Sequence, residues 1–160
     1  MKMKMKGMAW ALLVVVLGSC STESLEESPK PIAEAANAVE VEEELLALVN
    51  EHRISIGQPA LKFSAVAYEY ANAHTDYMIS KGSLSHDNFS SRASGISSEV
   101  NAAQVAENVA KDYSNAAAAL QGWLNSTNHK KTMEGDFTDT AVSVKKDPSG
   151  NLYFTQLFYR

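Results

Sequence analysis

The sequence predicts an α+β domain in which one sheet is sandwiched between helices. Two stretches, 39–56 and 64–81, carry apolar residues at helical spacing. The C-terminal part predicts a hairpin, with strands over 140–145 and 152–159 on either side of a turn rich in Pro, Ser and Gly. The second strand is apolar on both faces, and such a strand is normally covered on both sides. We therefore expect helices above and below the sheet.

The two helices have recognisable ends. In the first, Val41, Leu45 and Val49 repeat at helical spacing, and Gly57 and Pro59 end the pattern. In the second, Ser64 is placed to cap the start and Gly82 to follow the last turn.

The middle of the chain is less regular. Residues 82–100 hold many Ser and Gly and predict a loop, followed by a short strand over 104–107. A third helix is expected from an N-cap at Ser114 to Leu124, with a short helical turn over 129–133.

The N-terminal residues predict a targeting signal and a membrane anchor. Residues 1–19 combine three lysines with an apolar run of about half the ~20 residues that a membrane-spanning helix needs, which is typical of a cleaved signal peptide. The sequence Leu17-Gly18-Ser19-Cys20 resembles a bacterial lipobox, which implies lipidation of Cys20, the only cysteine of the chain. The alternative is an ordinary secretory signal with an incidental cysteine.

Domain boundaries follow from this. We expect a signal peptide over 1–19, a lipidated Cys20 with a disordered Ser-, Glu- and Pro-rich tether over 20–38, and a folded domain over 39–160. The location predicted is the bacterial cell envelope, and the acidic residues Glu23, Glu26 and Glu27 favour the outer membrane or the cell surface.

Charge excludes one class of partner. The chain has 14 Lys and Arg against 19 Asp and Glu, a net charge of −5, and loss of Lys2, Lys4 and Lys6 with the signal peptide makes it −8. An acidic chain without a basic cluster would be repelled by phosphate backbones, so nucleic-acid binding is not expected.

Five short motifs, in order along the chain, resemble the CAP family, which unites cysteine-rich secretory, antigen 5 and pathogenesis-related 1 proteins. The resemblance is to its bacterial, cysteine-free branch and covers about 39–160. The motifs are Asn50-x-x-Arg53-x-x-x-Gly57-x-x-x-Leu61, Ser85-His86, Ala106-Glu107-Asn108-Val109-Ala110, Trp123-x-x-Ser126-x-x-His129 and Tyr153-x-x-Gln156-x-Phe158.

The resemblance implies a three-layer α-β-α sandwich around a mainly antiparallel sheet. It also implies a cleft lined by His86, Glu107 and His129. A fourth member of the cleft, a glutamate in animal and plant relatives, falls here at Ser126. This departure weakens any mechanism that needs two carboxylates.

Two interpretations of this residue set stay open. Neutral imidazoles and a carboxylate suit a divalent metal such as zinc, with His86 and His129 as ligands and Glu107 as a ligand or as an orienter of a histidine. The alternative is a hydrogen-bonded polar cluster without metal, in which the carboxylate fixes the imidazole tautomers.

Other polar residues have structural interpretations. His74 shares a stripe with Ala67, Ala71 and Met78 and is expected to be a packed histidine. Asn50, Arg53 and Asn108 are expected to brace the fold through hydrogen bonds to the backbone.

The sequence thus supports a binding module more than an enzyme. We expect the cleft of His86, Glu107, Ser126 and His129 to bind an envelope lipid, glycan or protein ligand. The alternative is a metal-dependent hydrolase in which Glu107 acts as the base toward a metal-bound water.

Overall fold

The computed structural model describes residues 32–160. The predicted signal peptide, Cys20 and the tether as far as residue 31 lie outside the described residues. Within 32–160, none of the helices combines the length and the apolar character that crossing a membrane requires.

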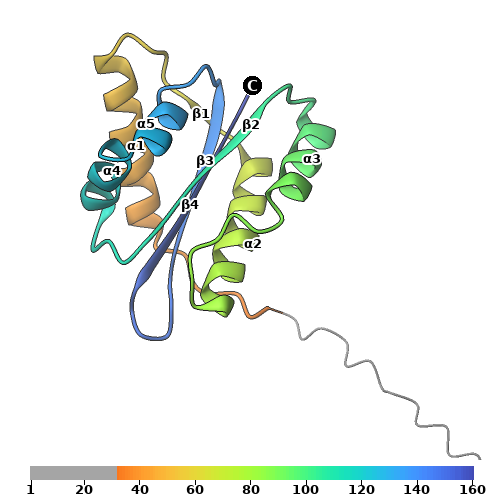
Figure 1. Ribbon diagram of the computed structural model, residues 1–160, viewed down its shortest axis with the longest axis vertical. Coiled ribbons are helices and arrows are strands. Elements are labelled where there is room, and N and C mark those ends of the chain that lie inside the picture. Colours follow the sequence, from red (N-terminus) through yellow and green to blue (C-terminus); the bar gives the residue numbers. More distant parts are fainter. Residues whose placement is uncertain (1–31) are drawn as a thin grey trace, which may run out of the picture. The chain divides into compact units, whose positions relative to one another are not determined.

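A four-stranded sheet forms the middle layer, in the order β1-β3-β4-β2 (Figure 1). β3 (Asp139–Lys146) and β4 (Leu152–Tyr159) form the predicted hairpin, and β2 (Val105–Lys111) pairs antiparallel with the other side of β4. The two-residue strand β1 (Lys62–Phe63) runs parallel to β3. The sheet is therefore mainly antiparallel, as expected.

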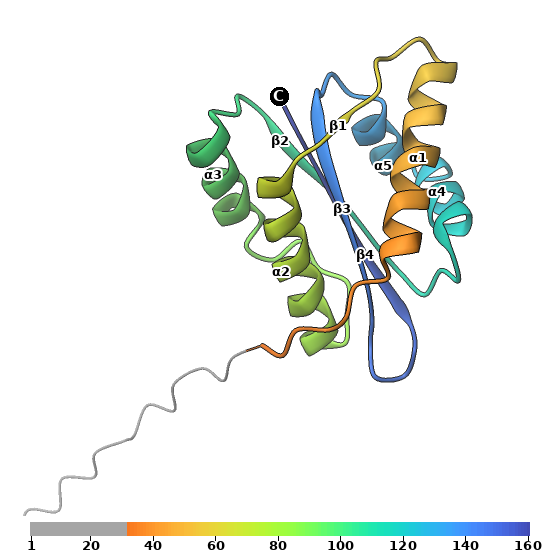
Figure 2. The same cartoon turned by 180° about the vertical axis from the view of Figure 1, so that it is seen from behind.

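Helices cover both faces of this sheet. Figures 1 and 2 show α1 (Val39–Ser55), α4 (Ala116–Leu124) and α5 (Thr127–Met133) on one side. α2 (Ala65–Lys81) and α3 (Phe89–Val100) lie on the other side. Every residue of β4 from Leu152 to Phe158 is buried. The expectation that a strand apolar on both faces is covered on both faces is confirmed.

The predicted ends of the second helix are confirmed. The Ser64 side chain accepts a hydrogen bond from the backbone N–H of Ala67, at the start of α2. Gly82 follows the last turn with φ of 67°, in the left-handed region that glycine adopts without steric cost.

The expectation of a loop over 82–100 is wrong for its second half, which forms α3. Phe89, Arg92 and Ile96 recur at helical spacing, and Ile96 packs under α2 in one apolar cluster with Ala67. The serines and Gly95 conceal this pattern in the sequence. Gly95 is needed there because a Cβ atom at that position would collide with the ring of Tyr70.

Two further boundaries differ from the prediction. β2 extends to Lys111, because its backbone pairs with β4 along its whole length. The N-cap of α4 is Asn115 and not Ser114, since the Asn115 side chain accepts a 2.8 Å hydrogen bond from the N–H of Ala118.

The expected bracing roles of Asn50 and Arg53 are confirmed. Asn50 exchanges two hydrogen bonds with the backbone of Leu61, at 2.8 and 3.1 Å. The fully buried Arg53 guanidinium donates to four backbone carbonyls, at distances of 2.6 to 3.3 Å. These carbonyls belong to Pro59, Met133, Gly135 and Phe137. One side chain thus ties the end of α1 to the segments that leave α5.

Candidate functional site

The candidate site lies along β2, the edge strand of the sheet. Successive residues of a strand point to opposite faces, so Glu107 and Asn108 face different helical layers. Glu107 meets α3 and the loop after α2, and Asn108 reaches α5, where its amide donates a 3.0 Å hydrogen bond to the carbonyl of His129. This alternation allows residues from both helical layers to approach one strand.

Glu107 is the buried centre of the site, with only 2% of its side chain exposed. Arg92 of α3 holds the carboxylate from one side: its Nε lies 2.9 Å from Oε2, and its Nη2 lies 2.7 and 2.9 Å from the two oxygens. Such a two-pronged pair compensates a buried carboxylate well, because both oxygens receive charged donors. Another guanidinium N–H donates to the carbonyl of Asp87 at 2.7 Å.

His86 contacts the same carboxylate from the solvent side. Its Nδ1 lies 2.8 Å from Oε1 of Glu107, while 56% of its side chain is exposed. A carboxylate accepts the proton of this hydrogen bond, so Nδ1 carries the hydrogen and a neutral His86 has its lone pair on Nε2. The buried carboxylate thus fixes the tautomer of an accessible imidazole.

His74 lies behind this pair and is packed, as expected, with 2% exposure. Its Nε2 donates to the carbonyl of Ser85 at 2.7 Å and lies 3.8 Å from Oε1 of Glu107. The ring of Tyr77 stacks on it at 5.9 Å. Burial lowers the pKa of His74 below the ordinary histidine value, and the nearby Glu107 carboxylate opposes this shift only in part. His74 is therefore neutral at pH 7 and positions the loop that carries His86.

His129 approaches from the opposite helical layer, on α5, and is half-buried. Its pKa is lowered, first by burial and second by the charge of His86. His129 is linked to β2 through its backbone carbonyl, which accepts the hydrogen bond from Asn108. A hollow of about 220 Å³ opens at this edge, lined by His86, Phe89, Val105, Ala106, Glu107 and Thr132. Thr132 follows His129 by one helical turn.

Ser126 is separate from these contacts. It is the N-cap residue of α5, is half-buried, and makes no side-chain capping hydrogen bond. A serine side chain has no carboxylate, so this position supplies no second acidic group.

Glu107 is not free to act as a metal ligand. Both oxygens of Glu107 are engaged by Arg92, and Oε1 also accepts the proton of His86. Across residues 32–160, no three His, Cys, Asp or Glu side chains converge in a way that could hold an ion. The geometry corresponds to the hydrogen-bonded polar cluster, with the carboxylate as the group that orients a histidine.

Arg92 is the member of the site that the sequence analysis missed. It lies in the segment expected to be a loop, so nothing marked it as a partner of Glu107. The available signal was its helical spacing between Phe89 and Ile96, which places a charged side chain on an otherwise apolar helix face.

Removing the charge on Arg92 should destabilise the protein strongly. We expect Arg92→Met to lower the free energy of unfolding by about 3 kcal/mol, because it leaves the Glu107 carboxylate buried without its cation. The double variant Arg92→Met/Glu107→Gln should recover much of this loss, with a coupling energy of about 2 kcal/mol in a urea-unfolding cycle. Additive effects of the two substitutions would contradict the pairing.

The buried His74 should make stability depend on pH. As the pH falls below about 6.5, the unfolded chain takes up a proton at this histidine while the folded protein resists protonation. The contribution of His74 to the free energy of unfolding therefore decreases as the pH falls toward the lowered pKa of the folded state. Below that pKa, this contribution no longer changes with pH. His74→Gln, which keeps a donor for the Ser85 carbonyl, should flatten this slope in urea melts. An unchanged slope in the variant would show that His74 is not the group responsible.

Comparisons with known proteins agree with this fold. Residues 46–158 match the CAP family, described as the cysteine-rich secretory protein family. The chain is 30% identical over 123 residues to the uncharacterized membrane protein YlbC of Bacillus subtilis (strain 168), covering 74% of this chain and 34% of that protein. The chain thus spans about a third of the length of this curated relative.

Solved structures of bacterial proteins share this fold. An extracellular protein of Bacillus anthracis with an SCP domain superposes with a TM-score of 0.67 at 29% identity, covering 76% of this chain and 41% of that one. An outer surface protein of Borrelia burgdorferi shares the fold at 17% identity, with a TM-score of 0.71 and coverage of 79% and 96%. Residues 46–158 match the CAP family, and the helices on both faces of the sheet agree with this match. The chain therefore belongs to the CAP family.

Proposed function

We propose that this chain is a membrane-anchored extracytoplasmic lipoprotein whose CAP domain binds an envelope lipid, glycan or protein ligand. The observation that carries the proposal is the state of His86. Its imidazole is oriented by a buried carboxylate at 2.8 Å, and more than half of its side chain is open to solvent. A pre-oriented polar group on an accessible surface gives a ligand a fixed hydrogen-bonding partner at low entropic cost.

A binding role is better supported than the metal-dependent hydrolase. That mechanism needs Glu107 free to take a proton from a metal-bound water. Arg92 instead holds both carboxylate oxygens, so Glu107 serves here as a positioning residue. In this proposal the ligand meets His86 and His129, whereas Ser126, the N-cap residue of α5, is separate from their contacts.

The envelope location rests on the N-terminal sequence and on the relatives. Residues 1–19 have the character of a signal peptide, and Cys20 follows a lipobox-like tetrad. The relatives are described as a membrane protein, an extracellular protein and an outer surface protein. The predicted tether would let the domain reach ligands away from the membrane. Its last residues are held against the domain, since the N–H of Ala35 donates to Asp76 and the amide of Asn37 donates to Asn72.

Lipidation can be tested at Cys20. In bacteria fed an alkyne-labelled fatty acid, the protein should take up the label, and Cys20→Ser should lose it because the acyl chains attach to the sulfur. The neighbouring Ser21→Ala is the matched control and should keep the label, read by click chemistry on gels. Undiminished labelling of Cys20→Ser would exclude this anchor.

The cleft can be tested with the double variant His86→Ala/His129→Ala. The full-length protein is immobilised, and lipid, glycan and protein fractions of one envelope preparation are passed over it separately. Capture of one fraction should drop at least about tenfold in the double variant, as expected for the loss of one or two hydrogen bonds to a ligand. Bound material is measured by mass spectrometry.

His52→Ala is the control for this experiment. His52 lies on α1, where its Nε2 pairs with Glu134 at 2.8 Å, away from the cleft residues. It should capture as much as the wild type, and thermal melts should show that all variants are folded. Equal capture by the wild type and the double variant would refute the assignment of the ligand site.

A further inference from the structure

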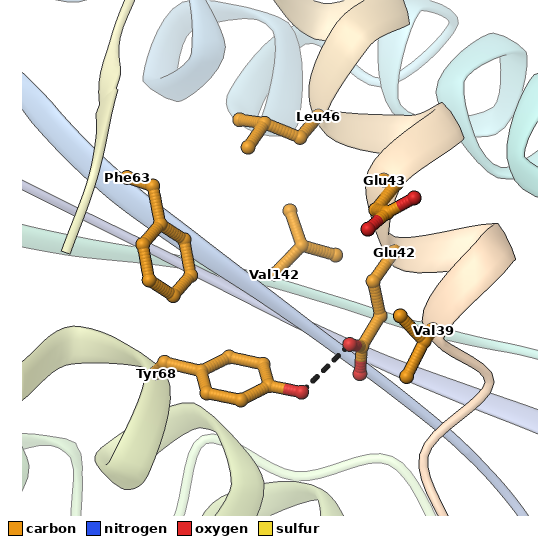
Figure 3. Close-up of a pocket in the computed structure, with 7 residues that line it drawn as sticks. All are labelled: Val39, Glu42, Glu43, Leu46, Phe63, Tyr68 and Val142. Carbon is orange, nitrogen blue, oxygen red and sulfur yellow. Dashed lines mark hydrogen bonds between the residues drawn. The ribbon is translucent and has the colours of Figure 1, made fainter. Parts of the chain in front are cut away.

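A second hollow, of about 380 Å³, lies at the opposite edge of the sheet from His86 (Figure 3). It opens between α1 and the start of α2, above β3, and shares no lining residue with the histidine hollow. Its volume is within the range of small-molecule sites. The seven residues that line it are Val39, Glu42, Glu43, Leu46, Phe63, Tyr68 and Val142.

Two aromatic rings form one wall of this hollow. Phe63 is 57% exposed, and its ring centroid lies 5.6 Å from that of Tyr68, with the planes inclined by 58°. Tyr68 is held in place because its hydroxyl donates a 2.7 Å hydrogen bond to Oε2 of Glu42. The rings therefore present two differently inclined π-faces to the same space, one of them fixed.

The opposite wall is acidic. Figure 3 shows Glu42 and Glu43 side by side on α1, with the Glu42 carboxylate turned toward Tyr68. Glu42 is 7% exposed, and the donors that hold its carboxylate are neutral: the N–H of Val144, the amide of Asn37 and the hydroxyl of Tyr68. Glu43 is exposed on the rim, and no basic side chain lines the hollow. This side of the hollow is therefore negative.

Apolar surface completes the hollow. Three aliphatic side chains supply it: in Figure 3, Leu46 lies at the top of the view, Val142 in the middle, and Val39 beside Glu42 on α1. A ligand that fits must thus combine an apolar body with a positive group. The glutamates would repel an anion, and a neutral ligand would offer them no charge partner.

We propose that this hollow is a binding site for a small organic ammonium compound with a short alkyl chain. The ammonium group lies against the rings of Phe63 and Tyr68, where cation–π attraction acts within about 6 Å of a ring centroid. Glu42 and Glu43 supply the negative potential, and the alkyl chain covers Leu46 and Val142. This site is independent of the cleft proposed above.

The probe for this proposal is hexyltrimethylammonium, titrated into the full-length protein and followed by NMR shifts of the Val39, Phe63 and Val142 amides. Saturable shifts confined to this hollow are expected, and they should weaken as salt is added. Hexanoate, with a similar chain and the opposite charge, should produce none. Equal binding of hexanoate would overturn the proposal.

Substitutions at two exposed positions separate the contribution of the aromatic ring from that of the acidic charge. Phe63→Leu keeps an apolar side chain but removes the π-face, and Glu43→Gln removes one charge. Each should weaken binding of the probe about threefold, the usual effect of one exposed cation–π or charge contact. Glu51→Gln, an exposed position of α1 outside the hollow, should bind as the wild type does. Wild-type affinity in both Phe63→Leu and Glu43→Gln would refute the site.

Discussion

The burial of β4 on both faces is the constraint on which the rest of the structure depends. Leu152, Phe154 and Phe158 belong to the core under α1 and α4, and Leu157 belongs to the core under α2. Each such side chain contributes about 2 kcal/mol when it leaves water, so both helical layers are required. With the faces of the central strand closed, the edges of the sheet are left for polar chemistry. Both hollows accordingly lie at edges, one beside β2 and the other beside β3.

At the β2 edge, the arrangement follows from one buried negative charge. A carboxylate with 2% exposure needs a cation and a full set of hydrogen bonds, and Arg92 and His86 supply them to Glu107. Arg92 supplies the balancing positive charge to the carboxylate, and the same carboxylate holds His86 in a fixed orientation. The charged pair is thus structural support, and the histidine is the group available to a ligand.

The two edges offer different chemistry to solvent. The β2 edge presents histidines, whose ring nitrogens each donate or accept one hydrogen bond. The β3 edge presents aromatic rings opposite glutamates, which favour a permanent cation. No lining residue is shared, so substitutions at one edge leave the other as an internal control.

Local patterns were sufficient to identify both long helices, the hairpin and the sandwich, since these follow from periodicity, caps and the two apolar faces of one strand. Motif order also pointed to His86, Glu107 and His129. Those residues are separated by about twenty positions, however, and only packing around the sheet decides which of them touch. Arg92 illustrates the limit: serines and Gly95 conceal α3 in the sequence, and only the fold shows that a Cβ atom at position 95 would collide with the ring of Tyr70. The sequence likewise does not predict the hollow beside Phe63, because its walls come from four separate elements, α1, β1, α2 and β3. Contacts between such distant segments are set by three-dimensional packing, which no short window of sequence encodes.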